Sequence, residues 1–114
     1  MTPLKSSTWL ETLFLGIGYL ERYLVAGDSM TPTLSPGDEV AVDHRGTVVE
    51  GDIVVMRHPF KTDIVVIKRL DHIEDSGEFY LLSDNPVGSS DSRGFGAVPR
   101  KHFLGKAVAR ICND

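Results

Sequence analysis

The chain has 114 residues, 41% of them hydrophobic and 25% charged, and this balance predicts one globular domain with a modest core. A formal net charge of -4 provides no basic field for a phosphate backbone, so we expect no nucleic-acid partner. Cys112, the only cysteine, can form no internal disulfide. We expect it to be an inert, small hydrophobic side chain and not a nucleophile.

The first segment, "TWLETLFLGIGYLERYLV", predicts an amphipathic helix, and we assign residues 1–26 to it. The uncharged run 12–20 is about half of the roughly 20 apolar residues that a membrane-spanning helix needs. We therefore expect the helix to pack against the domain or a partner, with flat binding to a membrane surface as the alternative. Its apolar half on a helical wheel contains Trp9, Leu10, Leu13, Phe14, Ile17, Leu20 and Leu24.

From Gly27 onward the hydrophobic pattern changes to that of strands, and we assign residues 27–114 to one domain. The predicted strands lie in "DEVAVDH", "GDIVVMRHP", "DIVVIKRLDHI", "EFYLLSD" and "FLGKAVARI". They predict a mainly β fold, a coiled antiparallel sheet or small barrel of about six strands. The intervening "NPVGSSDSRGFGAVPRK" is too long for a hairpin loop, which suggests a function for it.

The stretch "GDSMTPTLSPGDEV" holds Ser29 in an unusual setting. Pro32 and Pro36 lack backbone donors and fix φ, so this segment is expected to be a shaped loop. Ser29 is either a turn or capping residue or a nucleophile, and a nucleophile needs a base to take its proton. The four histidines lie in charged or turn contexts far apart in sequence, with the spacing of neither a triad nor a metal site, so we expect no metal or other cofactor.

Lys68 interrupts the apolar run "IVVIKRL" and is the candidate base. Neighbouring residues of a strand point to opposite faces, so either Lys68 or Arg69 is directed at what the aliphatic residues cover. If it is Lys68, desolvation lowers its pKa and frees a neutral amine to act as a base. The alternative is a surface lysine whose aliphatic stem lies along the strand.

Four stretches in order resemble the sequence boxes of the type I signal peptidases, the Ser/Lys-dyad proteases that share a β fold with the LexA-like self-cleaving repressors. They are "SMTPTLSPGDEV", "EGDIVV", "VIKRLDHI" and "SDNPVGSSDSRGFGAVP", and the resemblance covers roughly residues 25–111. It implies a serine endopeptidase that cuts a precursor protein bound as an extended peptide.

The same resemblance implies the site residues. Ser29 would be the nucleophile, with its backbone N–H in the oxyanion hole, and Lys68 the general base. Ser89 would orient Lys68, and Asp91 and Arg93 would pair to brace the active-site loop. We expect small substrate side chains to enter a pocket beside Met30 and Leu34.

The chain also departs from the signal peptidase pattern. Gly27 stands where many of these enzymes have a serine that donates to the oxyanion, and Ser83 and Pro86 replace the usual Gly and Arg around "DN". The short length without a spanning anchor resembles the nickel-type superoxide dismutase maturation proteases, which implies a cytoplasmic enzyme that trims that precursor.

Three alternatives remain. The chain would otherwise be a type I signal peptidase acting on secretory preproteins at the membrane periphery, a self-cleaving LexA-like module, or a non-catalytic binding module in which Ser29 and Lys68 are relics.

Overall fold

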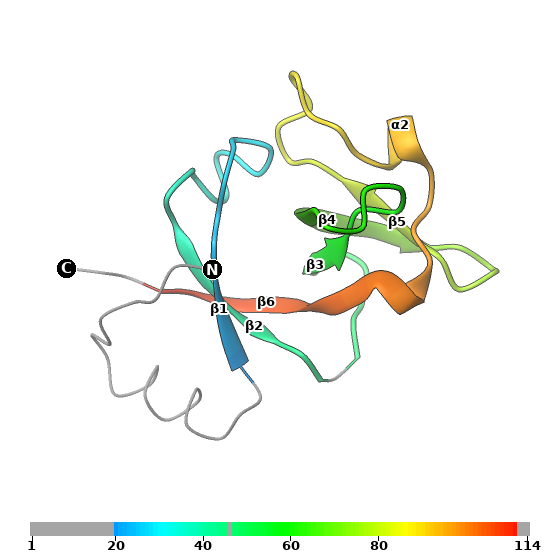
Figure 1. The fold of residues 1–114 in the computed structure, drawn as a ribbon, viewed down its shortest axis with the longest axis horizontal. Coiled ribbons are helices and arrows are strands. Elements are labelled where there is room, and N and C mark those ends of the chain that lie inside the picture. The colour runs from blue at the N-terminus through cyan, green and yellow to red at the C-terminus, as the bar shows by residue number, and fades with distance from the viewer. Residues whose placement is uncertain (1–19, 46, 112–114) are drawn as a thin grey trace.

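The computed structural model describes residues 20–45 and 47–111, and within them the chain forms one open six-stranded antiparallel sheet (Figure 1). The strand order is β1-β2-β6-β3-β4-β5. This arrangement confirms the predicted mainly β fold of about six strands. The strands are β1 (Leu20–Leu24), β2 (Glu39–Asp43), β3 (Ile53–Arg57), β4 (Val65–Ile73), β5 (Phe79–Leu82) and β6 (Phe103–Ile111).

The first strand corrects the helix prediction at its C-terminal end. Leu20–Leu24 forms β1, which pairs antiparallel with β2 from Leu20 opposite Asp43 to Leu24 opposite Glu39. A five-residue segment has little helical stability of its own, so pairing with a neighbouring strand overrides the helical pattern. The rest of the predicted helix, residues 1–19, lies outside the described residues.

Across the described residues, no helix has the length and apolar character that crossing a bilayer requires.

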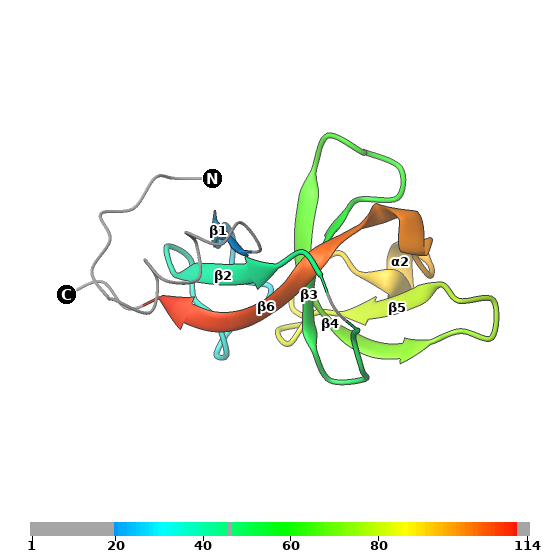
Figure 2. The same cartoon turned by 90° about the horizontal axis from the view of Figure 1, so that it is seen from below.

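The long strand β6 crosses the molecule and joins its two parts, as both ribbon views show (Figure 2). It pairs with β2 along one half and with β3 along the other. A separate hydrophobic cluster lies on each side of the sheet, and β3 contributes to both, with Val54 and Met56 in one cluster and Val55 in the other. This is the two-residue alternation of a strand buried on both faces.

Two loops gather at one end of the sheet, the cyan β1–β2 loop and the yellow loop that follows β5 (Figure 1). The second leads into a one-turn helix, α2 (Ser92–Phe95), and then through the 3₁₀ turn Arg100–His102 into β6. Among the predicted site residues, the first loop carries Ser29, Met30 and Leu34 and the second carries Ser89 and Asp91, whereas Lys68 lies in β4 and Arg93 in α2.

Candidate active site

The β1–β2 loop, which carries Ser29, is held in shape by backbone hydrogen bonds. Val25 N–H donates to the Asp38 carbonyl (2.8 Å) and Gly37 N–H to the Val25 carbonyl (2.9 Å), which closes the base of the loop. Within it, Leu34 N–H donates to the Met30 carbonyl at 2.8 Å. The loop is therefore a fixed turn that leaves Ser29 half-buried.

Gly27 has φ of +75°, a conformation that side-chain-bearing residues rarely adopt. A serine at this position would be strained, which gives a conformational reason for the missing side-chain donor. Within the described part of the chain, the Ser29 backbone N–H donates to no protein acceptor.

The loop after β5 clamps the loop that carries Ser29. Asn85 N–H donates to the Ser29 carbonyl (2.8 Å), and its side-chain amide donates to the Asp28 carbonyl and the Thr31 hydroxyl (both 3.2 Å). Thr33 Oγ1 donates to Asp84 Oδ2 at 2.6 Å. Two segments far apart in sequence thus position Ser29 together, and the sequence analysis assigned no role to Asp84 or Asn85.

Lys68 lies in β4 opposite Val54 and is only 5% exposed. It has the same strand parity as Val66 and Leu70, which pack in one core cluster. Its neighbour Arg69 points the other way and binds Asp84 through two hydrogen bonds, of 3.1 and 2.6 Å. The surface-lysine alternative is therefore wrong.

The environment of Lys68 favours the neutral amine. Burial lowers the pKa of its ammonium below the usual value, and the negative charge of Asp91 opposes that change. The Lys68 Nζ donates to Ser83 Oγ at 3.1 Å, and Ser83 is itself 7% exposed.

Ser29 and Lys68 line one cavity of about 170 Å³. Its walls come from the end of β1 and the start of β4, with Val40 and Val55 contributing from strands between them; the remaining lining residues are Tyr23, Leu24, Val25, Ala26, Val65, Val66 and Ile67. β1 is a sheet edge, and β5 pairs with β4 only from Arg69 onward. In the described part of the chain, the cavity thus lies between two strand edges without a neighbouring strand.

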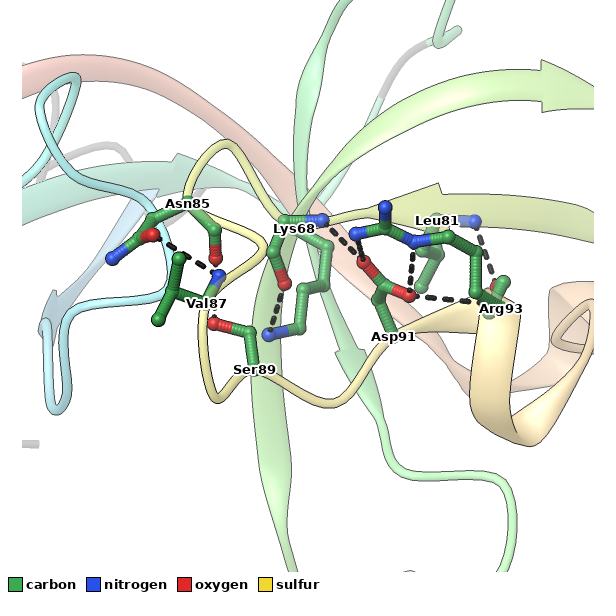
Figure 3. Close-up of polar contacts among 9 residues, drawn as sticks. Lys68, Leu81, Asn85, Val87, Ser89, Asp91 and Arg93 are labelled. Atoms are coloured by element: carbon green, nitrogen blue, oxygen red, sulfur yellow. Dashed lines mark hydrogen bonds and ion pairs between the residues drawn. The ribbon is translucent and has the colours of Figure 1, made fainter.

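Asp91 and Arg93 form the expected ion pair, with Arg93 Nη2 2.7 Å from Asp91 Oδ2 (Figure 3). Asp91 also caps α2 by accepting from the Arg93 N–H, and it accepts from the Ser83 N–H at 2.9 Å. Burial by itself would raise the pKa of this carboxyl, but these hydrogen bonds lower it to about 2. Asp91 therefore stays ionised and ties the end of β5 to the start of α2.

Ser89 makes a different contact from the one that the resemblance implies. Its hydroxyl donates to the Asn85 carbonyl at 2.7 Å (Figure 3). The hydroxyl that accepts from Lys68 is that of Ser83. In the sequence, Ser83 is notable only as a departure from the usual Gly. That departure was the one available signal for it.

Met30 and Leu34, beside which the substrate pocket was predicted, are not among the residues that line this cavity. Met30 is fully buried and Leu34 is 5% exposed, and both belong to the cluster that contains Val40 and Val55. The tight turn from Met30 to Leu34 directs both side chains into the core, so they support the loop from behind.

Comparison with known proteins identifies the family of this chain. The family model described as Peptidase S24-like matches residues 19–107, which include all the candidate site residues. The chain belongs to the Peptidase S24-like family, and this membership identifies it as a peptidase.

Two similar proteins are subunits of mitochondrial inner membrane proteases. The chain is 30% identical to the mitochondrial ATP-independent inner membrane protease subunit 1a of Arabidopsis thaliana, over 80% of this chain and 73% of that protein. It is 27% identical to the mitochondrial inner membrane protease subunit 1 of Xenopus tropicalis, over 80% of this chain and 68% of that protein.

Proposed function

We propose that this chain is a serine endopeptidase that uses Ser29 as nucleophile and Lys68 as general base to remove a short N-terminal leader from a precursor protein. The observation that supports this most is the shared cavity: a half-buried serine on a clamped loop and a buried lysine line the same small space. A buried lysine without a chemical role is costly, since desolvation disfavours its charge.

The reaction is acyl transfer. Ser29 Oγ attacks the scissile carbonyl carbon while its proton passes to the neutral Lys68 Nζ. When the C–N bond breaks, Lys68 returns that proton to the leaving amine. Water then attacks the ester carbonyl, Lys68 takes a proton from it, and Ser29 Oγ leaves as the hydroxyl. The backbone N–H of Ser29 is one donor for the oxyanion.

The strand edges beside the cavity suit an extended peptide. Val65 to Lys68 of β4 and Tyr23 and Leu24 of β1 line the cavity, and each of these strand edges has no neighbouring strand in the described residues. An extended substrate can pair with such edges through its main chain, while its alternate side chains enter the cavity. About 170 Å³ accommodates small side chains, in keeping with a small-residue cleavage site.

Two substrate classes follow from different observations. The sequence resemblance favours the precursor of a nickel-type superoxide dismutase, processed in the cytoplasm. The relatives named above are inner membrane protease subunits, and they favour a second candidate, processing of preproteins by an enzyme held at a membrane surface.

A cleavage assay with the full chain tests the dyad and the substrate together. The chain is incubated with a nickel superoxide dismutase precursor without detergent, and separately with a secretory preprotein in lipid vesicles, and mass spectrometry identifies new N-termini. We expect one cut just ahead of the first metal-binding histidine of the precursor, none with Ser29→Ala, and unchanged cleavage with Ser76→Ala on the exposed β4–β5 turn.

Cleavage of the vesicle-bound preprotein alone would move the assignment to the second candidate. Cleavage that survives in Ser29→Ala would contradict the dyad.

A further inference from the structure

We propose that Ser83, the residue directly after β5, positions the Lys68 amine for proton transfer. This inference rests on the proposed function and adds a positioning residue to it. A glycine, which the sequence resemblance leads one to expect here, has no side chain to do so.

The contact is direct and shielded from water. Lys68 Nζ donates to Ser83 Oγ at 3.1 Å, and the two residues are 5% and 7% exposed. Water has little access to replace the hydroxyl in this place, so the amine depends on a protein acceptor. Among the described residues, Ser83 Oγ is the acceptor to which the Lys68 amine donates.

The hydrogen bond determines where the lone pair of the amine points. A neutral lysine amine has two N–H bonds and one lone pair, and it rotates freely about the Cε–Nζ bond unless an N–H is held. With one N–H on Ser83, fewer orientations remain, and the lone pair can be directed into the cavity that Ser29 lines.

Ser83 is itself held by its backbone. Its N–H donates to Asp91 Oδ2 at 2.9 Å, and the Arg93 guanidinium fixes that carboxylate. The Ser89 hydroxyl donates instead to the Asn85 carbonyl at 2.7 Å, within its own loop (Figure 3). A chain of hydrogen bonds therefore connects Arg93 to Asp91, Asp91 to Ser83, and Ser83 to Lys68.

The charged and titratable groups around Lys68 are few among the described residues. Asp91 acts on it by charge and is paired with Arg93, and the phenol of Tyr23 lines the same cavity. Since a hydroxyl accepts more strongly from an ammonium than from an amine, loss of the Ser83 hydroxyl should ease deprotonation of Lys68.

The test compares Ser83→Ala with Ser83→Thr, which keeps a hydroxyl, and with Ser90→Ala, an exposed serine of the same loop, as the control. The readouts are the pH profile of kcat/KM and an NMR titration of the Lys68 side chain in the full chain. For Ser83→Ala we expect kcat/KM to fall about tenfold, as for a lost hydrogen bond at a reacting group, with the acidic limb and the Lys68 titration moving to lower pH. Ser83→Thr should restore both, and Ser90→Ala should change neither.

An unchanged pH profile and Lys68 titration in Ser83→Ala would overturn the proposal. The titration needs no substrate, so it separates the two hypotheses: a wild-type chain that cleaves nothing, yet shows a shifted Lys68 titration in Ser83→Ala, refutes the proposed function and keeps the contact. Circular dichroism checks folding, and if Ser83→Thr does not fold, the titration of Ser83→Ala decides by itself.

Discussion

At the scale of single residues, the proposed chemistry depends on how one lysine is buried. Lys68 and Arg69 are adjacent in β4, and the pleat sends them to opposite faces. Arg69 is partly exposed and keeps its charge against Asp84, whereas Lys68 is almost fully buried and meets a neutral hydroxyl. Their positions are not exchangeable, because a guanidinium does not lose its proton in proteins.

Lys68→Arg should abolish cleavage. The guanidinium stays charged and cannot accept the Ser29 proton, and loss of general-base catalysis costs about 10²- to 10⁴-fold in kcat. Steady-state kinetics on the precursor measures the effect, with Lys61→Arg, in the exposed β3–β4 turn, as the control. Retained activity in Lys68→Arg would rule out the lysine as base.

The wild-type rate should rise with pH. As the proposed base, Lys68 would act when deprotonated, and burial lowers its pKa below 10.5, so we expect the midpoint of the rise below 10.5. The negative charge of Asp91 favours the ammonium and so limits how far the pKa of Lys68 is lowered. A pH profile of kcat/KM between pH 6 and 10 measures the midpoint, and a flat profile contradicts a titrating base.

At the scale of elements, the site depends on short connections between strands. Asp91 links the end of β5, the first turn of α2 and Arg93 through one carboxylate. The loop between β5 and α2 has few apolar side chains, so hydrogen bonds rather than packing hold it in place.

Asp91→Ala should lower kcat and leave the chain folded. The change leaves the Ser83 N–H without its acceptor, at a cost of about 1–3 kcal/mol, and loosens the residue that contacts Lys68. Activity and thermal unfolding are compared with those of Asp75→Ala, an exposed residue of the β4–β5 turn. Full activity in Asp91→Ala would show that the loop is ordered in another way.

Gly105 marks the point where β6 passes close to β2. A Cβ atom built there lies 2.5 Å from Val42 Cγ1 and 2.7 Å from the Asp43 carbonyl oxygen. Gly105→Ala should therefore lower the free energy of unfolding by about 1–3 kcal/mol, since the strands must separate. Gly94→Ala is the control, because a Cβ at Gly94 has no neighbour within 4 Å. Equal denaturation midpoints for the two variants would contradict this close packing.

At the scale of the whole molecule, the open sheet coils so that its first and fifth strands in spatial order line one cavity. No single element contains the site. β1, β4 and the two loops at one end each contribute a part, and the long β6 joins the halves of the sheet (Figures 1 and 2).

A bound peptide should complete the sheet at this cavity. In Ser29→Ala, which binds without cutting, a precursor peptide should protect the backbone amides of β1 and of Val65 to Lys68 from hydrogen exchange, because main-chain pairing shields them. Mass spectrometry of exchanged fragments measures this, with residues 74–78 of the β4–β5 turn as the internal control. Protection confined to that turn would place the peptide elsewhere.

Much of the fold follows from local pattern. The strands from β2 to β6 lie where alternation and β-branched runs indicate them, and the prolines around Ser29 predict its shaped loop. β1 was missed because "LERYL" has apolar residues at helical spacing and pairs only when β2 is beside it. Of the candidate site, the motifs and the resemblance predicted Ser29, Lys68, Asp91 and Arg93, whereas Ser83, Asp84 and Asn85 make contacts that no local pattern indicates.

The sequence by itself determined the backbone preferences, the positions of β2 to β6 along the chain and the residue types that the proposed chemistry requires, because these depend on neighbours in the chain. The tertiary structure decided which face of β4 is buried, that Met30 and Leu34 turn into the core, and that Ser83 rather than Ser89 binds Lys68. These outcomes depend on desolvation and on hydrogen bonds between segments far apart in sequence, which exist only once the sheet has brought those segments together.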